Sequence, residues 1–251
     1  MRLTSEQRVD GVVERRFLLD EIPGILWLPE PASSADPVPL ILAGQPGGPA
    51  GLGAMYPRLL GRARHAAASG FATATLELPG SGGRPQPAGV AEARTELRRA
   101  VAAGEHVPDD VVDRLVLPLV DQAVPEWQAA LDALLELPEL GGPVGFSGGL
   151  ISVATRLAAV EPRIAAAVLF AGSFVPRSIL AEARRVTIPL YVLLQWDDEG
   201  NDRQLALDLF DAFGSTEKTL NANLGGHTGV PQHAGDDANR FFERHLGTRR
   251  E

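Results

Sequence analysis

The sequence predicts a single α/β domain, with a mostly parallel sheet and helices on both of its faces. Short apolar, β-rich runs alternate along most of the chain with segments whose apolar residues recur at helical spacing. Alternation of this kind implies right-handed crossover connections and a sheet covered on both sides. The chain has 251 residues, 45% of them hydrophobic, which is enough for one substantial core, and no repeat or linker divides it. We therefore expect one domain over residues 1–251, with about eight strands.

The N-terminal part of the chain predicts an antiparallel hairpin at one edge of the sheet. Residues 12–28 contain two β-rich runs around a turn. A short buried strand at 40–43, a helix at 56–68 and a further strand at 71–78 follow. Each of the two later strands runs into a glycine-rich loop, which is typical of the edge of a parallel sheet where functional groups gather.

Residues 84–115 interrupt this alternation with a helical excursion. The segment is rich in Arg, Ala and Glu at helical spacing, and a second short helix is predicted from Pro108. Its charge pattern is equally consistent with a solvated helical face and with a small lid over a site at the end of the sheet. A longer amphipathic helix is predicted at 119–137, with Pro125 as either a kink or its true start.

The second half of the chain returns to regular alternation. It predicts four strands that would continue the parallel part of the sheet, each followed by one helix. The strands are expected at 144–146, 164–171, 190–195 and 218–222, and the helices at 150–160, 178–185, 202–213 and 236–246.

The most informative motif lies between one of these strands and its helix. Residues 145–149 are Gly-Phe-Ser-Gly-Gly, which puts Ser147 at the centre of a Gly-x-Ser-x-Gly pattern. In this context we expect Ser147 on a tight strand-to-helix turn with its hydroxyl exposed above the sheet. The helix that follows points its free N–H groups and its positive dipole end at the same place, which favours an oxyanion there. The pattern predicts a nucleophilic serine.

Candidate partners for Ser147 follow two later strands. A serine hydroxyl needs a base to take its proton, and that base needs a third group to orient it. The expected order along a chain of this kind is serine, acid, histidine. Three adjacent carboxylates, at 197–199, directly follow the strand at 190–195, and the next strand leads to His227 in a glycine-rich loop. His233 is the one serious rival to His227 as the base.

Composition excludes several other classes of function. The chain has no cysteine, so disulfides, thiolate catalysis and cysteine-ligated metals are excluded, and no His-x-x-x-His or His-x-His pair suggests a metal. A net charge of −9 argues against nucleic acid and anionic membranes as partners and mildly against polyanionic substrates. The N-terminal residues lack the apolar core of a signal peptide. We expect a cytoplasmic protein that acts on a small molecule without a metal or cofactor, and the sequence makes no prediction of its oligomeric state.

On these motifs the chain resembles the α/β-hydrolase superfamily over roughly residues 12–246, and most closely its esterase and dienelactone-hydrolase-like bacterial branch. The resemblance implies a triad of Ser147, Asp198 and His227. The acid motif of the family usually reads Gly-x-x-Asp, and because Gln195 stands at its glycine, Asp198 is favoured over Asp197, with Glu199 third. The segments that carry the resemblance are 42–48, 78–84, 145–149, 195–198 and 225–227.

The resemblance also implies an oxyanion hole made of two backbone N–H groups. One belongs to the residue after the nucleophile, Gly148. The other comes from the loop after the first parallel strand, where relatives commonly carry a His-Gly pair that this chain lacks. One alignment of that loop makes Gln45 the donor and a shift by two makes it Gly47, since Pro46 has no N–H. We prefer Gln45.

A serine hydrolase is the function that these residues predict. It would cleave a carboxylic ester or a related acyl bond through an acyl-enzyme intermediate. An acyltransferase or thioesterase would use the same residues with another acyl acceptor or donor. A non-catalytic binding protein on the same fold is the alternative from a different class, because a fold does not fix a function.

Overall fold

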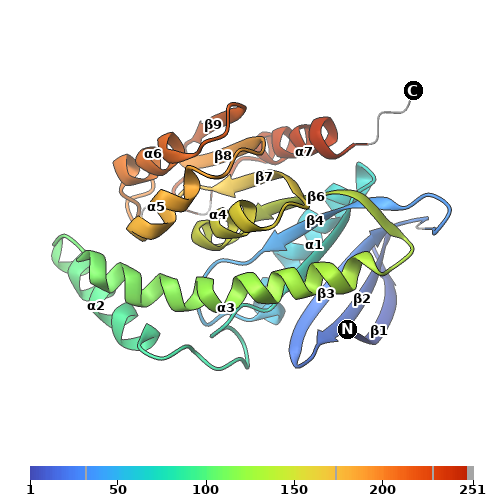
Figure 1. The fold of residues 1–251 in the computed structure, drawn as a ribbon, viewed down its shortest axis with the longest axis horizontal. Helices are drawn as coiled ribbons and strands as arrows, with labels where there is room; N and C mark the ends of the chain where they lie inside the picture. Colours follow the sequence, from blue (N-terminus) through green and yellow to red (C-terminus); the bar gives the residue numbers. More distant parts are fainter. Residues whose placement is uncertain (32, 173, 228, 248–251) are drawn as a thin grey trace.

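The computed structural model of the chain describes residues 1–31, 33–172, 174–227 and 229–247. Over these residues it forms one nine-stranded sheet (Figure 1). The strands are β1 (Arg2–Val9), β2 (Val12–Leu19), β3 (Ile22–Pro29), β4 (Val38–Gly44), β5 (Ala72–Leu76), β6 (Leu140–Gly148), β7 (Ile164–Phe170), β8 (Leu190–Gln195) and β9 (Lys218–Asn223). Their order across the sheet is β1-β2-β3-β5-β4-β6-β7-β8-β9. In the part β1-β2-β3-β5 of this order neighbouring strands are antiparallel, and in the part β5-β4-β6-β7-β8-β9 they are parallel.

Helices cover both faces of this sheet. They are α1 (Leu52–Ala68), α2 (Val90–Ala103), α3 (Asp109–Leu135), α4 (Ile151–Val160), α5 (Arg177–Ala183), α6 (Arg203–Ala212) and α7 (Gln232–Leu246). Alternate residues of a strand face opposite sides. Ile41 of β4 and Val168 of β7 belong to a core cluster with residues of α1 and α7, whereas their neighbours Leu42 and Leu169 belong to the cluster under α3 to α6 (Figure 1). The predicted α/β fold with an antiparallel N-terminal edge is confirmed.

The structure adds one strand to the prediction. β1 has the sequence RLTSEQRV, and almost every residue in it is exposed. Such a strand carries no alternation of apolar and polar residues, which is the signal that predicts strands from sequence. β1 is held by its pairing with β2, and its charged side chains are typical of an unpaired sheet edge.

The helical excursion also differs from the prediction. The short helix expected from Pro108 and the helix expected at 119–137 form one continuous helix, α3, of 27 residues that runs through Pro118 and Pro125. A proline inside a helix removes a hydrogen bond. The long apolar face of α3, which buries Val116, Val120 and Trp127 among others, compensates for this loss. α2 packs along α3 and buries its small side chains there.

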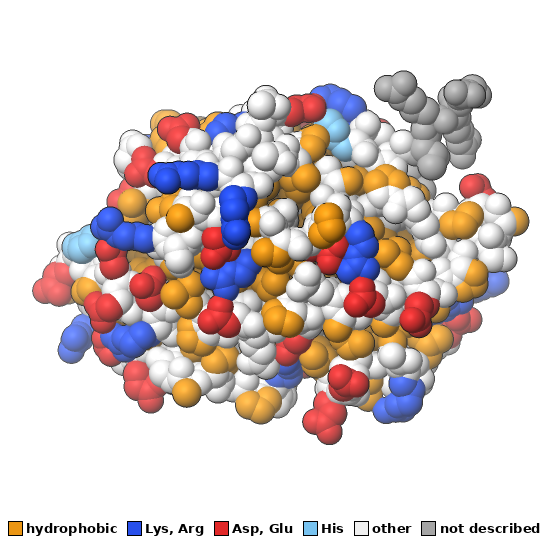
Figure 2. Space-filling view, in the orientation of Figure 1, with side chains coloured by type: hydrophobic (Ala, Val, Ile, Leu, Met, Phe, Trp, Pro, Cys, Tyr) orange, Lys and Arg blue, Asp and Glu red, His pale blue; other side chains and the backbone are white. Residues whose placement is uncertain are grey.

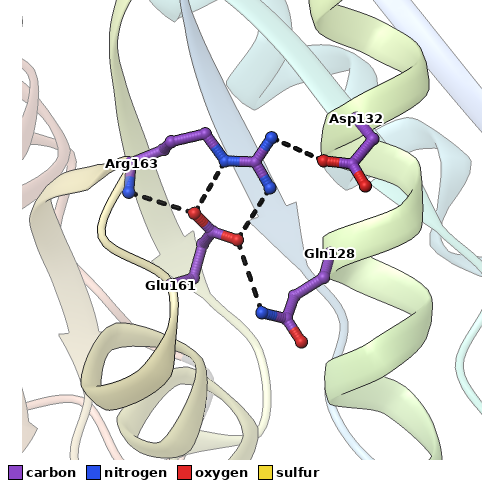
Figure 3. Close-up of polar contacts among 4 residues, drawn as sticks. All are labelled: Gln128, Asp132, Glu161 and Arg163. Carbon is purple, nitrogen blue, oxygen red and sulfur yellow. Dashed lines mark hydrogen bonds and ion pairs between the residues drawn. The ribbon is translucent and has the colours of Figure 1, made fainter.

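A partly buried ion pair and its neighbours connect α3 to the residues before β7 (Figure 3). Glu161 is 3% exposed and accepts hydrogen bonds from Arg163 Nε (2.7 Å) and Gln128 Nε2 (3.4 Å), while Arg163 Nη1 also donates to Asp132 (2.6 Å). The hydrogen bonds from Arg163 lower the pKa of Glu161. This cluster precedes β7, at the opposite end of that strand from the carboxyl edge, so we assign it a structural role.

The surface that α3 to α6 form carries charges of both signs. Figure 2 shows basic and acidic side chains interspersed among apolar ones on this face. Among the helices that the structure describes, none combines the length and apolar character needed to cross a bilayer.

Candidate active site

The predicted site residues lie at the carboxyl ends of neighbouring parallel strands. Ser147 is the second-to-last residue of β6, Asp198 follows β8, and His227 follows β9. Parallel strands present their carboxyl ends at one edge of the sheet, which brings these segments to the same side of the molecule. The structure joins Asp198 to His227, and it joins Ser147 to Arg62 of α1.

Asp198 and His227 form a hydrogen-bonded pair. The Nδ1–H of His227 donates to Oδ2 of Asp198 at 2.7 Å, and the other carboxylate oxygen accepts from the backbone N–H of Gly200 at 3.0 Å. The Asp198 side chain is 4% exposed, whereas that of His227 is 75% exposed. A buried carboxylate on Nδ1 fixes the tautomer in which Nε2 carries the lone pair. The pair therefore presents a base at an accessible position.

The loop that carries His227 is held by two further side chains from the end of β8. The carboxylate of Asp197 accepts the N–H groups of Gly225 and Gly226, both at 2.9 Å. Gln195 Nε2 donates to the carbonyl oxygen of Gly226 at 2.8 Å. The hydrogen bonds from Gly226 and Gly225 lower the pKa of Asp197. Asp197, the second candidate for the acid, thus binds the loop backbone rather than the imidazole.

Two other sequence candidates lie outside this pair. Glu199 makes no side-chain hydrogen bond or ion pair with any described residue, and His233 lies in the first turn of α7. A contact that the sequence did not predict is that of Phe170, at the end of β7, whose ring meets the imidazole of His227 edge-on with centroids 6.1 Å apart. The strand order β7-β8-β9 puts the ends of these strands next to one another, which the residue spacing does not show.

Ser147 contacts an arginine that the sequence did not single out. Arg62 Nη2 donates to the Ser147 hydroxyl oxygen at 2.9 Å and to its carbonyl oxygen at 2.8 Å. Between the described side chains of Ser147 and His227 there is no hydrogen bond. Arg62 lies 85 residues before Ser147 on another element, so no local pattern could have predicted the contact.

The sharp turn after β6 is displaced from the position that the sequence predicts. Ser147 has an ordinary extended backbone: among described residues other than glycine, only Asp10 and Asp20 have positive φ. The left-handed conformations fall on Gly148 (φ 71°) and Gly149 (φ 76°). Glycine adopts this region without steric cost, so the turn is formed by the two glycines after Ser147 and not by Ser147 itself.

Gly149 is also where the backbones of β4 and α4 meet. A Cβ atom at Gly149 would lie 2.7 Å from the Cα of Gly44 and 3.0 Å from the backbone nitrogen of Gln45. The next residue, Leu150, donates its N–H to the carbonyl oxygen of Gln45 at 3.1 Å. The turn therefore carries no side chain and fits closely against the end of β4.

One predicted oxyanion donor, Gly148, lies in this turn, and the other, Gln45, lies next to it at the end of β4. The Gln45 side chain points away from it, because Nε2 donates to the carbonyl oxygen of Leu76 at 2.5 Å, while its backbone nitrogen faces Gly149. Gly148 lies against Arg62, where a Cβ atom would be 3.0 Å from Nη2. No group of three or more His, Asp or Glu side chains in the described part of the chain is placed to hold a metal ion.

A parallel sheet of this order, with an acid–histidine pair at the ends of two successive strands, defines an α/β-hydrolase fold. Solved structures agree with this. The chain is similar to a cold-adapted esterase from an Arctic intertidal metagenomic library, with a TM-score of 0.74 and 27% identity over 98% of this chain and 100% of that one. It is also similar to acetyl xylan esterase 1 from a Thermoanaerobacterium species (TM-score 0.65, 14% identity, 97% and 87% coverage) and to an esterase from Pyrococcus furiosus (0.61, 10%, 97% and 91%).

The comparison by sequence gives no relative: the chain matches no protein-family model and no curated protein. The similarity to solved structures shows that the fold is that of α/β-hydrolase esterases, as the motifs in the sequence imply.

Proposed function

We propose that the protein hydrolyses a carboxylic ester or a related acyl bond of a small molecule, with Asp198 and His227 as its acid–base pair and Ser147 as its nucleophile. One observation carries the proposal: the 2.7 Å hydrogen bond that joins a buried carboxylate to an accessible imidazole at the ends of β8 and β9. The similarity to structures named as esterases supports carboxylesterase-like hydrolysis.

The proposed reaction has two halves. Ser147 gives up its contact with Arg62, and its hydroxyl attacks the ester carbonyl while Nε2 of His227 takes the proton. The backbone N–H groups of Gln45 and Gly148 donate hydrogen bonds to the oxyanion, and Asp198 stabilises the imidazolium. The imidazolium returns its proton to the departing alcohol. Water then attacks the acyl-enzyme while His227 takes a proton from it, and the imidazolium returns this proton to the Ser147 oxygen as the carboxylic acid is released.

A second mechanism for the same overall reaction is favoured by the surroundings of Ser147. Its hydroxyl contacts Arg62, and no hydrogen bond joins the described side chains of Ser147 and His227. In this mechanism His227 takes a proton from water, the resulting hydroxide adds to the carbonyl, and the same proton leaves with the alcohol. No covalent intermediate forms.

Two variants and a covalent probe separate these mechanisms. We expect wild-type protein to hydrolyse p-nitrophenyl acetate or butyrate and His227→Ala to lose this activity under either mechanism. Under the first mechanism Ser147→Ala is equally inactive, and a fluorophosphonate labels Ser147 of the wild type. Activity in Ser147→Ala, with no labelling of the wild type, would establish the second. A folded wild-type protein with neither turnover nor labelling would contradict ester hydrolysis and favour a binding role.

A further inference from the structure

Arg62 is a cation beside the candidate nucleophile that forms no ion pair with any described residue. Other arginines near the same end of the sheet are already engaged. Arg84 is paired with Glu126 at 2.5 Å, and Arg16 with Glu14 at 3.1 Å. Arg203 stacks on the ring of Trp196, 4.2 Å from its centroid. The Arg62 side chain is exposed, and desolvation by the protein around its guanidinium lowers its pKa, as for a cation that has no paired anion.

The hydrogen-bonding capacity of Arg62 is only partly used. Nη2 makes both contacts to Ser147, while Nη1 and Nε have no acceptor among the described residues. A guanidinium is a planar fork whose donors match the two oxygens of a carboxylate. Gly148 makes room for this fork, since a Cβ atom there would lie 3.0 Å from Nη2 and 3.2 Å from Nη1.

Arg62 and His227 border the same face at the end of the sheet. Ser147 is paired with Val168 of β7, and Val168 packs in the core cluster beneath α1 and α7. Phe170, two residues further along β7, faces the same side and contacts the imidazole of His227. An acyl group held between Ser147 and His227 would therefore have the guanidinium next to it.

We propose that Arg62 binds a carboxylate on the acyl part of the substrate, so that the preferred substrates are short half-esters of dicarboxylic acids. The proposal rests on the ester hydrolysis proposed above and names its substrate class. Because Arg62 has no ion-pair partner among the described residues, we infer that this one arginine holds one carboxylate.

The test compares two esters that differ in one charge. Mono-p-nitrophenyl glutarate is anionic, and p-nitrophenyl pentanoate is a neutral ester of the same chain length. We expect wild-type protein to favour the anionic ester in kcat/KM and Arg62→Gln to lose this preference by roughly 10–100-fold, as for a lost charge-assisted hydrogen bond. Arg58→Gln, on the preceding turn of α1, is the matched control and should keep the wild-type ratio. The preference should shrink as sodium chloride is added.

Binding of glutarate itself keeps the test independent of turnover. By calorimetry, glutarate should bind wild-type protein and Arg58→Gln with similar affinity and bind Arg62→Gln more weakly, with thermal melts showing that all three are folded. This result would support the carboxylate site even if neither ester were hydrolysed, in which case only the proposed function would fail. An equal ester ratio in Arg62→Gln and wild type, or glutarate binding that does not depend on Arg62, would overturn the inference.

Discussion

The two halves of the candidate site are built in different ways. At the ends of β8 and β9, three side chains fix the histidine loop: Gln195 and Asp197 bind its backbone, and Asp198 binds its imidazole. At the end of β6 one side chain, that of Arg62, binds the backbone before the turn, and the close packing of Gly149 against Gly44 sets the path of the turn itself. One half is positioned by directed hydrogen bonds and the other by backbone shape. The proposed base is therefore held by several side chains, whereas the proposed nucleophile, Ser147, is hydrogen-bonded to Arg62.

We expect the largest effect on activity when the adjacent carboxylates Asp198 and Asp197 are replaced one at a time. Asp198→Asn removes the charge that stabilises the imidazolium, and we expect kcat/KM to fall about 10²–10⁴-fold. Asp197→Asn is the matched variant, and it keeps one acceptor oxygen for the loop. Because the Asp197 carboxylate is exposed and binds the loop backbone rather than the imidazole, the fall in kcat/KM for Asp197→Asn should stay within about tenfold. Equal losses in steady-state hydrolysis would show that the two carboxylates do not have separate roles.

In the half of the site at the end of β6, adding one methyl group at Gly149 should lower the stability of the protein. Gly149→Ala forces a side chain into a left-handed backbone, at a cost of about 1–2 kcal/mol, and places its Cβ 2.7 Å from Gly44. We expect a clear fall in the free energy of unfolding in urea. Gly53→Ala, in α1 with no atom within 4 Å of the added carbon, should leave stability unchanged or raise it by up to about 1 kcal/mol. If both variants unfolded alike, close packing would not define the turn.

The smallest effect concerns pH. The backbone N–H groups of Gly226 and Gly225 lower the pKa of Asp197 below its ordinary value of 3.8. A carboxylate with a lowered folded-state pKa stabilises the protein above that ordinary value and loses this contribution as pH falls through the folded value. The difference in Tm between wild type and Asp197→Asn should therefore be present at neutral pH and shrink below roughly pH 4. A difference that grew on acidification would mean that the Asp197 carboxylate does not stabilise the loop.

The sequence predicted those parts of the molecule that depend on local patterns. Alternating strands and helices predicted the sheet, and the position of polar residues after two strands pointed to Asp198 and His227, which the structure finds in contact. β1 was missed because its residues are polar on both faces. The continuity of α3 was missed because burial of its apolar face outweighs the local effect of two prolines.

The remaining parts of the site depend on backbone angles and on distant contacts. A Gly-x-Ser-x-Gly pattern places glycines around Ser147, but it does not say which residue takes the left-handed conformation. With two glycines after the serine, the turn moves onto them. Arg62 reaches Ser147 because α1 packs on the sheet, and the spacing of residues in the sequence does not predict that contact.

The fit between Gly44 and Gly149 has a consequence for recombination between related proteins. The two residues lie more than one hundred positions apart in the chain, yet their backbones are so close that there is no room for a side chain at Gly149. A chimera that takes the β4 loop from one parent and the start of α4 from another would bring together surfaces that were not matched to each other. Chimeras in which both segments come from the same parent should fold, and chimeras in which they come from different parents should not.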